Sequence, residues 1–365
     1  MSTEEIPGPR NGGRSKCLAT TSIGKTPVVS KVYRRIPGDD DVGIEIICCG
    51  VCHTDLHQIN NDWNNTIYPL VPGHEIIGII RLLGSNVNEF YIGEKVAVGT
   101  YVDSCRKCTS CLRRIPQYCK DGLIYTYNSM YKPDDDVQTF GGYSTFIVVN
   151  RNFVFRIPHH LPIAGVAPLL CAGITVYSPM KFCRIGNNSS VGVAGIGGLG
   201  HVAVKIARAL GSKVTCISTS SSKREAAKRL GASAFIQLTN PEEMKTHAGT
   251  MDLIIDTISA DHEIGPYRKC IFGTCIGSPD ETRELLSLCG AYNITADVEV
   301  ASVDNIGEVL ERLKNNDVKF RFVLDMRTLK DGFSGPLLQS TSSSVIKNIT
   351  KQIASDESKS DEEDD

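Results

Sequence analysis

Four cysteines lie within fifteen residues of this chain, in the spacing C-x2-C-x2-C-x7-C: Cys105, Cys108, Cys111 and Cys119. Short loops between thiolates let one Zn²⁺ take four sulfur ligands in a tetrahedron, and this closed shell leaves no position for a substrate. Disulfides or unrelated loop cysteines are the alternatives, but two-residue gaps suit disulfides between neighbours poorly. The spacing therefore predicts a structural zinc.

Three further candidate ligands are scattered along the chain: Cys52, His74 and Cys171. Two thiolates and one imidazole leave the fourth tetrahedral position open for water or an alcohol oxygen, as a catalytic zinc requires. Each residue also has a simpler interpretation. Cys171 lies in an apolar stretch where inert cysteines are common, and His74 could satisfy a turn. Spacing alone leaves both interpretations open.

A glycine turn follows the apolar run 190–194 and precedes a helical pattern. In this context a G-x-G-x-x-G turn lets a pyrophosphate approach the backbone and the helix N-terminus. We therefore predict a dinucleotide-binding turn made by Gly195, Gly197, Gly198, Leu199 and Gly200.

The end of the next expected strand indicates which dinucleotide binds. It carries hydroxyls and two cations, and it lacks the acid that binds the ribose 2′-OH in NAD enzymes. Hydroxyls and cations can hold a 2′-phosphate, which an acid would repel. An ordinary solvated turn is the alternative. We predict NADP as the cofactor, held at the ribose by Ser218, Thr219, Ser220, Lys223 and Arg224.

The elements that must position these residues change character near Cys171. A strand is expected over 42–47, followed by a cysteine-rich turn over 48–53, and short strands continue to about residue 168. A helix over about 168–182 then precedes alternating strands and helices, which predict a parallel sheet with crossover helices. The expected strands are 190–194, 213–218, 234–237 and 251–258, and the expected helices are 202–210 and 223–230.

The predicted fold class is α/β with two domains, because 365 residues suit two cores better than one. Residues 1–171 and 299–328 form a β-rich catalytic domain, and residues 172–298 form a Rossmann-like nucleotide-binding domain. Residues 329–365 are expected to be a disordered acidic tail, with a partner-binding arm as the alternative.

Composition excludes several classes of partner. The net charge of −2 argues against nucleic acid and membrane surfaces, although the last ten residues hold seven acids and one lysine. We find no apolar run of transmembrane length and no signal-peptide pattern, so the expected location is cytoplasmic. In that reducing compartment, clustered cysteines bind metal more often than they form disulfides.

In their order along the chain, these motifs resemble those of the zinc-dependent medium-chain alcohol dehydrogenases. The residues within the motifs are most similar to those of the plant cinnamyl-alcohol and mannitol-dehydrogenase-like branch. The resemblance runs from about Thr26 to Met326 and is carried by GVCHTDLH at 50–57, PGHE at 72–75, the four-cysteine cluster and GIGGLG at 195–200. It implies a GroES-like catalytic domain whose catalytic zinc is held by Cys52, His74 and Cys171. It also implies that Glu75 lies beside this zinc as a neighbouring or exchanging ligand.

The resemblance further implies a proton route and a reaction. Thr54, two residues after Cys52, can take the proton of a zinc-bound alcohol, and His57 resembles the relay residue that passes it to solvent. Both argue against relatives that have lost the relay and reduce imines or alkenes. The implied reaction is reversible hydride transfer between NADPH and a primary alcohol/aldehyde pair, with two zinc ions per chain.

The resemblance is interrupted between Pro266 and Arg268, where relatives carry roughly thirty more residues, about one helix-plus-strand unit. The predicted nucleotide-binding domain therefore lacks this unit. A skipped exon or gene-model error is the simplest explanation, and real loss of function is the alternative. The family is typically a homodimer through this domain, so dimer formation is left open.

Two aromatic residues are candidates for the substrate pocket. Relatives that reduce lignin aldehydes usually carry tryptophan at the position of Tyr125, whereas Trp63 resembles a pocket wall of the mannitol and monoterpenol-type members. Both are equally compatible with a place in the core. Because Tyr125 replaces the tryptophan of the lignin-aldehyde reductases, another allylic, benzylic or terpenoid alcohol is favoured as the substrate. The rival functions are a zinc-independent NADPH reductase and a truncated, non-enzymatic zinc-binding protein.

Overall fold

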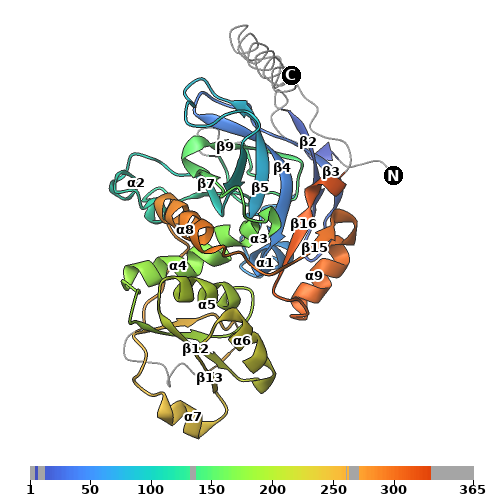
Figure 1. Ribbon diagram of the computed structural model, residues 1–365. Helices are drawn as coiled ribbons and strands as arrows, with labels where there is room; N and C mark the ends of the chain where they lie inside the picture. The colour runs from blue at the N-terminus through green and yellow to red at the C-terminus, as the bar shows by residue number, and fades with distance from the viewer. Residues whose placement is uncertain (1–4, 7–12, 132–136, 260, 263–270, 330–365) are drawn as a thin grey trace, which may run out of the picture.

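The computed structural model describes residues 5–6, 13–131, 137–259, 261–262 and 271–329. Figure 1 shows two bodies, one built around strand β4 (Asp41–Val51) and the other around strand β12 (Lys213–Ser218). Helices α4 (Ala172–Phe182) and α8 (Pro279–Tyr292) lie between them and contact one another.

The first body is centred on a seven-stranded sheet in the order β10-β6-β5-β4-β16-β15, with β9 also pairing with β4. β4 is almost entirely buried, as its β-branched and small apolar residues predict. β16 comes from the far end of the described chain and lies antiparallel to β4, with Val323 opposite Gly50. The other bounds are β5 (Ile76–Leu83), β6 (Lys95–Val98), β9 (Phe146–Asn150), β10 (Val154–Arg156), β15 (Val298–Ser302) and β16 (Arg321–Asp325).

Smaller elements surround this sheet. A three-stranded sheet and a two-stranded sheet supply the other strands of the first body, and short helices lie in the connections. The strands are β1 (Glu5–Ile6), β2 (Arg14–Ala19), β3 (Val28–Tyr33), β7 (Tyr101–Asp103) and β8 (Ile124–Tyr125). The helices are α1 (His53–Asn60), α2 (Thr109–Leu112), α3 (Ile163–Val166) and α9 (Ile306–Lys314).

The second body is a parallel sheet in the order β13-β12-β11-β14, which confirms the predicted alternation of strands and helices. Its central strand β11 is buried, and α5 is buried along its apolar face. The remaining bounds are β11 (Ser190–Ala194), β13 (Ala234–Gln237), β14 (Leu253–Asp256), α5 (Gly200–Ala209), α6 (Arg224–Leu230) and α7 (Pro241–Thr246).

Three local predictions were wrong in detail. The expected turn over 48–53 is strand as far as Val51, because Cys49 pairs with Ile76 and Gly50 with Val323. The helix expected over 168–182 is interrupted at Cys171 (φ −123°, ψ −73°). The strand expected over 251–258 is shorter, and is assigned only to β14.

Two predictions lie outside the described residues: the loss of a helix-plus-strand unit between Pro266 and Arg268, and the acidic tail over 329–365, of which only residue 329 is described. In the part of the chain that the structure describes, β14 is an edge strand of the parallel sheet. In the same residues no single helix is long and apolar enough to cross a membrane. One bent pair, 163–170 with 172–182, meets the criteria of length and composition.

Candidate zinc and nucleotide site

One group of four potential metal ligands lies where the two bodies meet. Cys52 follows β4, His74 and Glu75 precede β5, and Cys171 directly precedes α4. One ligand atom from each residue lies within 4.8 Å of all the others. The break at Cys171 is therefore the point at which the chain leaves the first, β-rich body and contributes a thiol to the group.

These donors fit a zinc ion. His74 Nε2 and Glu75 Oε2 are buried and have no hydrogen-bond partner among the described residues, which is costly unless another group satisfies them. A hydrogen bond from Cys171 holds the pKa of the Cys52 thiol well below its usual range, with further help from Arg321 and His74. Two sulfurs, one imidazole and one carboxylate are a donor set that Zn²⁺ accepts.

Asp55 orients this group, although the sequence analysis did not single it out. Its carboxylate accepts hydrogen bonds from the backbone N–H of Cys52 (2.9 Å), the N–H of Gly73 (2.9 Å) and the Tyr143 hydroxyl (3.2 Å). Its Oδ1 also lies 3.4 Å from His74 Nδ1. Carboxylates behind metal-binding histidines fix the ring and its tautomer. The signal in the sequence was the acid three residues after the N-cap of α1.

Arg321, at the start of β16, is the second residue that the sequence analysis missed. It is buried and pairs with the Glu75 carboxylate. Burial raises the pKa of Glu75 to about 7, and the Arg321 charge acts in the opposite direction. A methyl group added at Gly198 would lie 2.8 Å from Arg321 Cδ. One side chain therefore touches both the ligand group and the glycine turn.

The glycine turn joins β11 to α5, as predicted. Gly195 has φ +85°, and a Cβ at Gly200 would lie 1.9 Å from the Gly195 carbonyl oxygen, so the turn excludes larger residues at both positions. Leu199 is the N-cap of α5, and a Cβ at Gly197 would meet no atom within 4 Å. An open turn at a helix N-terminus is suited to a pyrophosphate.

The residues expected at the ribose lie after β12. Ser218 ends this strand, and the backbone N–H of Ser220 donates to its hydroxyl at 3.3 Å. Thr219 is exposed between them. Lys223 reaches back to the glycine turn, where its Nζ donates to the Ile196 carbonyl at 3.2 Å.

Arg224 is arranged differently from Lys223. Its guanidinium donates to Glu243 Oε1 at 3.2 Å and lies 4.6 Å from the centre of the Phe235 ring. The structure therefore gives Arg224 partners on β13 and α7, so of these two neighbouring cations Lys223 is the one beside the glycine turn.

The two predicted relay residues both belong to α1. Cys52 Sγ lies 3.5 Å from Thr54 Oγ1, so this hydroxyl is next to the ligand group. His57, three residues further along, is on the same face of the helix and is partly exposed. Its Nδ1 lies 2.7 Å from Asp62 Oδ2.

The two predicted pocket aromatics are both on the surface. Trp63 is 50% exposed, and its ring centre is 5.1 Å from that of His57. Tyr125 is 44% exposed at the end of β8. Tyr127, two residues later, points inward instead and lies with its ring centre 5.8 Å from His74. The core interpretation of Trp63 and Tyr125 is therefore wrong.

The second cysteine group has the geometry of a closed thiolate shell. The four sulfurs lie within 4.8 Å of one another, and all four residues are free thiols: Cys105, Cys108, Cys111 and Cys119. The backbone N–H of Lys120 lowers the pKa of Cys108 to about 6, which favours the thiolate that binds metal. These residues fit a tetrahedral zinc without an open position.

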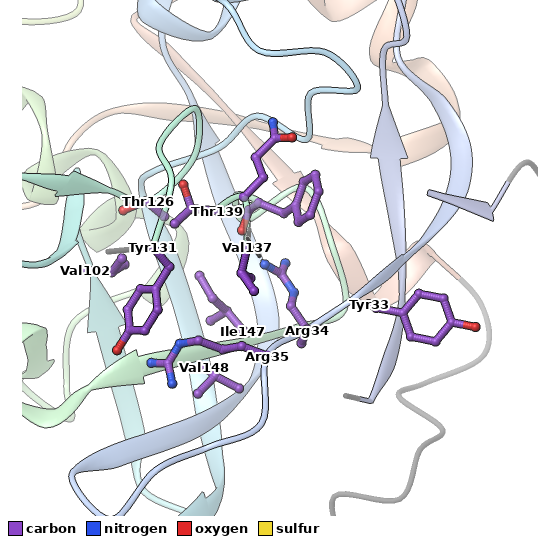
Figure 2. A pocket seen from close by; sticks show the side chains of 12 residues that line it. Tyr33, Arg34, Arg35, Val102, Thr126, Tyr131, Val137, Thr139, Ile147 and Val148 are labelled. Atoms are coloured by element: carbon purple, nitrogen blue, oxygen red, sulfur yellow. Dashed lines mark hydrogen bonds between the residues drawn. The ribbon is translucent and has the colours of Figure 1, made fainter. Parts of the chain in front are cut away.

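A small cavity of about 30 Å³ lies elsewhere in the β-rich body, beside Arg34 and Arg35. Figure 2 shows the two arginines pointing to different sides of it, Arg34 toward Thr139 and Arg35 toward Tyr131. The volume suits a water molecule rather than an organic substrate. None of the predicted site residues lines this cavity.

Known proteins match this chain along most of its length. The family model described as Alcohol dehydrogenase GroES-like domain matches residues 38–159, and Zinc-binding dehydrogenase matches residues 198–271. The protein named Probable mannitol dehydrogenase from Medicago sativa is 47% identical, over 80% of this chain and 89% of its own length. This chain belongs to the zinc-dependent alcohol dehydrogenases. Its position in that family is the plant cinnamyl-alcohol and mannitol-dehydrogenase-like branch.

Other alcohol dehydrogenases of this family extend the comparison. The 8-hydroxygeraniol dehydrogenase of Catharanthus roseus is 45% identical, over 81% of this chain and 91% of its own. The structure of a cinnamyl alcohol dehydrogenase from Sorghum bicolor has a TM-score of 0.80 and 40% identity, covering 86% of this chain and 98% of that one. A Helicobacter pylori structure described as CAD complexed with NADP(H) has the same TM-score and coverage at 33% identity. These likenesses confirm the predicted fold class.

Proposed function

We propose that this alcohol dehydrogenase interconverts primary alcohols and aldehydes by hydride transfer with NADP, at a zinc held by Cys52, His74 and Cys171. The observation that carries the proposal is the meeting of four ligand groups within 4.8 Å, three of them buried and Cys171 partly so, beside a glycine turn that shares Arg321 with them. Nucleotide and metal would thus lie on the two sides of one buried side chain.

When bound, zinc polarises the substrate oxygen and favours loss of the alcohol proton. The Thr54 hydroxyl, adjacent to Cys52, is placed to accept this proton. Asp62 holds His57 by Nδ1, which leaves its Nε2 to exchange the proton with water. Glu75 adds a carboxylate to the ligand group, and Arg321 balances its charge.

The second proposed zinc is structural. Cys105, Cys108, Cys111 and Cys119 would hold it as four thiolates, with no position left for a substrate. Its contribution is to the stability of the lobe that carries α2, not to hydride transfer.

The preference for NADP rests on the end of β12. Ser218, Thr219 and Ser220 offer hydroxyl groups, and Lys223 offers a cation beside the glycine turn. These groups can donate hydrogen bonds to a 2′-phosphate and balance its charge, whereas an acidic side chain is the usual partner of the ribose hydroxyls of NAD. The NADP(H) complex of the Helicobacter pylori relative supports the same choice.

The proposed substrates are allylic, benzylic or terpenoid primary alcohols and their aldehydes. Trp63 and Tyr125 are the proposed pocket walls, since both expose aromatic surface and Trp63 packs against the relay residue His57. The cinnamyl alcohol and 8-hydroxygeraniol dehydrogenases among the relatives fit this class. The proposed setting is the cytoplasm, as a monomer or a homodimer.

The proposal is tested by calorimetric titration of zinc-loaded protein with NADPH and with NADH, followed by a panel of aldehydes. We expect tighter binding of NADPH, and loss of activity in Cys52→Ser without loss of NADPH binding. Protein that holds its zinc but binds no NADPH would refute the proposal. Activity that survives Cys52→Ser would point instead to the zinc-independent reductase.

A further inference from the structure

His201, the second residue of α5, is completely buried between the glycine turn and the β-rich body. Its Nδ1 lies 3.0 Å from the Gly197 carbonyl oxygen, which can only accept, so Nδ1 carries the hydrogen and donates it. The backbone N–H of Asp297 donates to Nε2 at 3.2 Å. The two bonds together define one neutral tautomer of the ring.

The same ring also stacks on Phe320, with centres 4.6 Å apart and planes 11° apart. The Phe320 N–H donates to the Asp297 carbonyl at 3.1 Å, so the two contacts of His201 are themselves joined. Asp297 directly precedes β15, and Phe320 directly precedes β16. One imidazole therefore links the glycine turn to the beginnings of two strands of the seven-stranded sheet.

Burial keeps the His201 ring in its neutral form, and the charged groups around it act in both directions. Lys205, one turn further along α5, pairs with the Asp297 carboxylate and donates to the Thr295 carbonyl at 2.8 Å. Arg321 is a second cation near the ring. Burial, with smaller contributions from Lys205 and Arg321, lowers the pKa of His201 to about 4, while the hydrogen bond to Gly197 and the charge of Asp297 oppose the shift. The tautomer that the contacts require is therefore the one present at neutral pH.

We propose that His201 is a positioning residue, which sets the glycine turn and the dinucleotide on it at a fixed place relative to the catalytic zinc. The inference rests on the proposed function. The Gly197 carbonyl accepts a hydrogen bond from His201, and Gly198 lies against Arg321, which pairs with Glu75. A shift of the glycine turn would therefore move the bound nucleotide relative to the metal-ligand group. Hydride transfer is sensitive to such shifts, because an error of about 1 Å can cost on the order of a hundredfold in rate.

Three substitutions separate the contacts of this ring. His201→Asn places an amide nitrogen near Nδ1 and keeps the donor to Gly197. His201→Gln places an oxygen near Nε2 and keeps the acceptor for Asp297. His201→Phe keeps only the stacking on Phe320. Val204→Ala is the matched control, because Val204 is equally buried on α5 but takes no part in this contact.

The measurements are NADPH affinity by calorimetry, single-turnover hydride transfer at saturating NADPH, and the primary isotope effect with C4-deuterated NADPH. We expect His201→Phe to slow hydride transfer about tenfold or more at saturation and to raise the isotope effect on kcat. Asn and Gln should each recover part of the rate, and Val204→Ala should retain wild-type rates.

A His201→Phe protein with the affinity, rate and isotope effect of Val204→Ala would overturn the role of His201. If His201→Phe does not fold, the same comparison is made with Asn and Gln, and wild-type values for both would overturn it equally. Wild-type protein that binds no NADPH overturns the proposed function, and the role of His201 with it. The wild-type titration therefore distinguishes the two failures.

Discussion

Lys223 and Arg224 are adjacent cations with different surroundings, which only the structure distinguishes. From the sequence either could meet a 2′-phosphate, because Glu243, the partner of Arg224, lies nineteen residues further on in α7. Contacts over such separations depend on how strands and helices pack, and residue types alone do not determine them.

Replacing Lys223 should therefore affect NADPH more than replacing Arg224. We expect Lys223→Ala to weaken NADPH binding about tenfold or more, since a charge-assisted hydrogen bond contributes roughly 1.5–3 kcal/mol, and to leave NADH binding almost unchanged. Arg224→Ala should have a smaller effect on NADPH, because its charge is already paired with Glu243. Calorimetric titration of both variants with both nucleotides checks this. An equal loss in the two variants contradicts it.

Protonation of His201 provides a second prediction at this scale. Its pKa is about 4 in the folded protein, against about 6.5 when unfolded, so below pH 6.5 the unfolded chain binds the proton first. The lowered pKa of His201 therefore adds roughly 3 kcal/mol to the free energy of unfolding. This contribution is fully present above pH 6.5 and is lost as the pH drops toward 4. Urea unfolding at pH 7 and pH 5 should show a larger loss for wild type than for His201→Phe. Parallel losses would argue against it.

The two groups of potential metal ligands were predictable from the sequence, whereas the residues that surround and orient them were not. The four-cysteine cluster follows from local spacing, and Cys52, His74 and Cys171 required the order of motifs along the whole chain. Arg321 was missed because its partner Glu75 is 246 residues away. The pairing of β16 with β4 brings the two together, and no local pattern records that pairing.

Individual elements differ in how well the sequence indicated them. The alternation of strands and helices after Cys171 was predicted correctly, because a parallel sheet repeats one simple pattern. At the cysteine-rich end of β4 the sequence predicts a turn, since cysteine and glycine are weak indicators of strand. Its neighbours β5 and β16 provide the hydrogen bonds that extend it.

Arg34 shows how one buried side chain can fix an element near the site. Its guanidinium donates to the Phe140 and Gly141 carbonyls and to the Ser144 hydroxyl, so it holds the segment that carries Tyr143. Tyr143 in turn donates to Asp55.

Arg34→Met should therefore destabilise the β-rich body. We expect a loss of about 2 kcal/mol or more in the free energy of unfolding, because the buried Phe140 carbonyl loses its side-chain donor and the Gly141 carbonyl keeps only the Ser144 hydroxyl. Arg35→Met is the control, since Arg35 pairs with Asp41 at the edge of the same cavity and is less buried. Urea unfolding of both variants checks the prediction. A smaller loss in Arg34→Met than in Arg35→Met would contradict it.

At the scale of the whole molecule, the two metal groups have different positions and should have different effects on stability. The four-cysteine group is partly exposed in its own lobe, whereas three of the four residues of the other group are buried where the two bodies meet.

Cys105→Ser and Cys52→Ser should separate these effects. We expect Cys105→Ser to lose about one zinc per chain and to unfold at a clearly lower temperature, because a structural zinc contributes directly to folding. Cys52→Ser should lose hydride transfer with a smaller change in unfolding temperature. Metal analysis and thermal unfolding of the two proteins check this. A reversed order of unfolding temperatures would show that the catalytic zinc is the more important for the fold.

The pairing of β4 with β16 also has a consequence for biosynthesis. β4 leaves the ribosome early, but its neighbour β16 comes from residues 321–325, after the whole nucleotide-binding segment has been made. Since domains fold as units during synthesis, the parallel sheet can form while the β-rich sheet still lacks two strands. Arg321 arrives beside Glu75 only at that last stage. We therefore expect the catalytic metal to be retained stably only after translation of β16, whereas the four-cysteine lobe can take up its zinc much earlier.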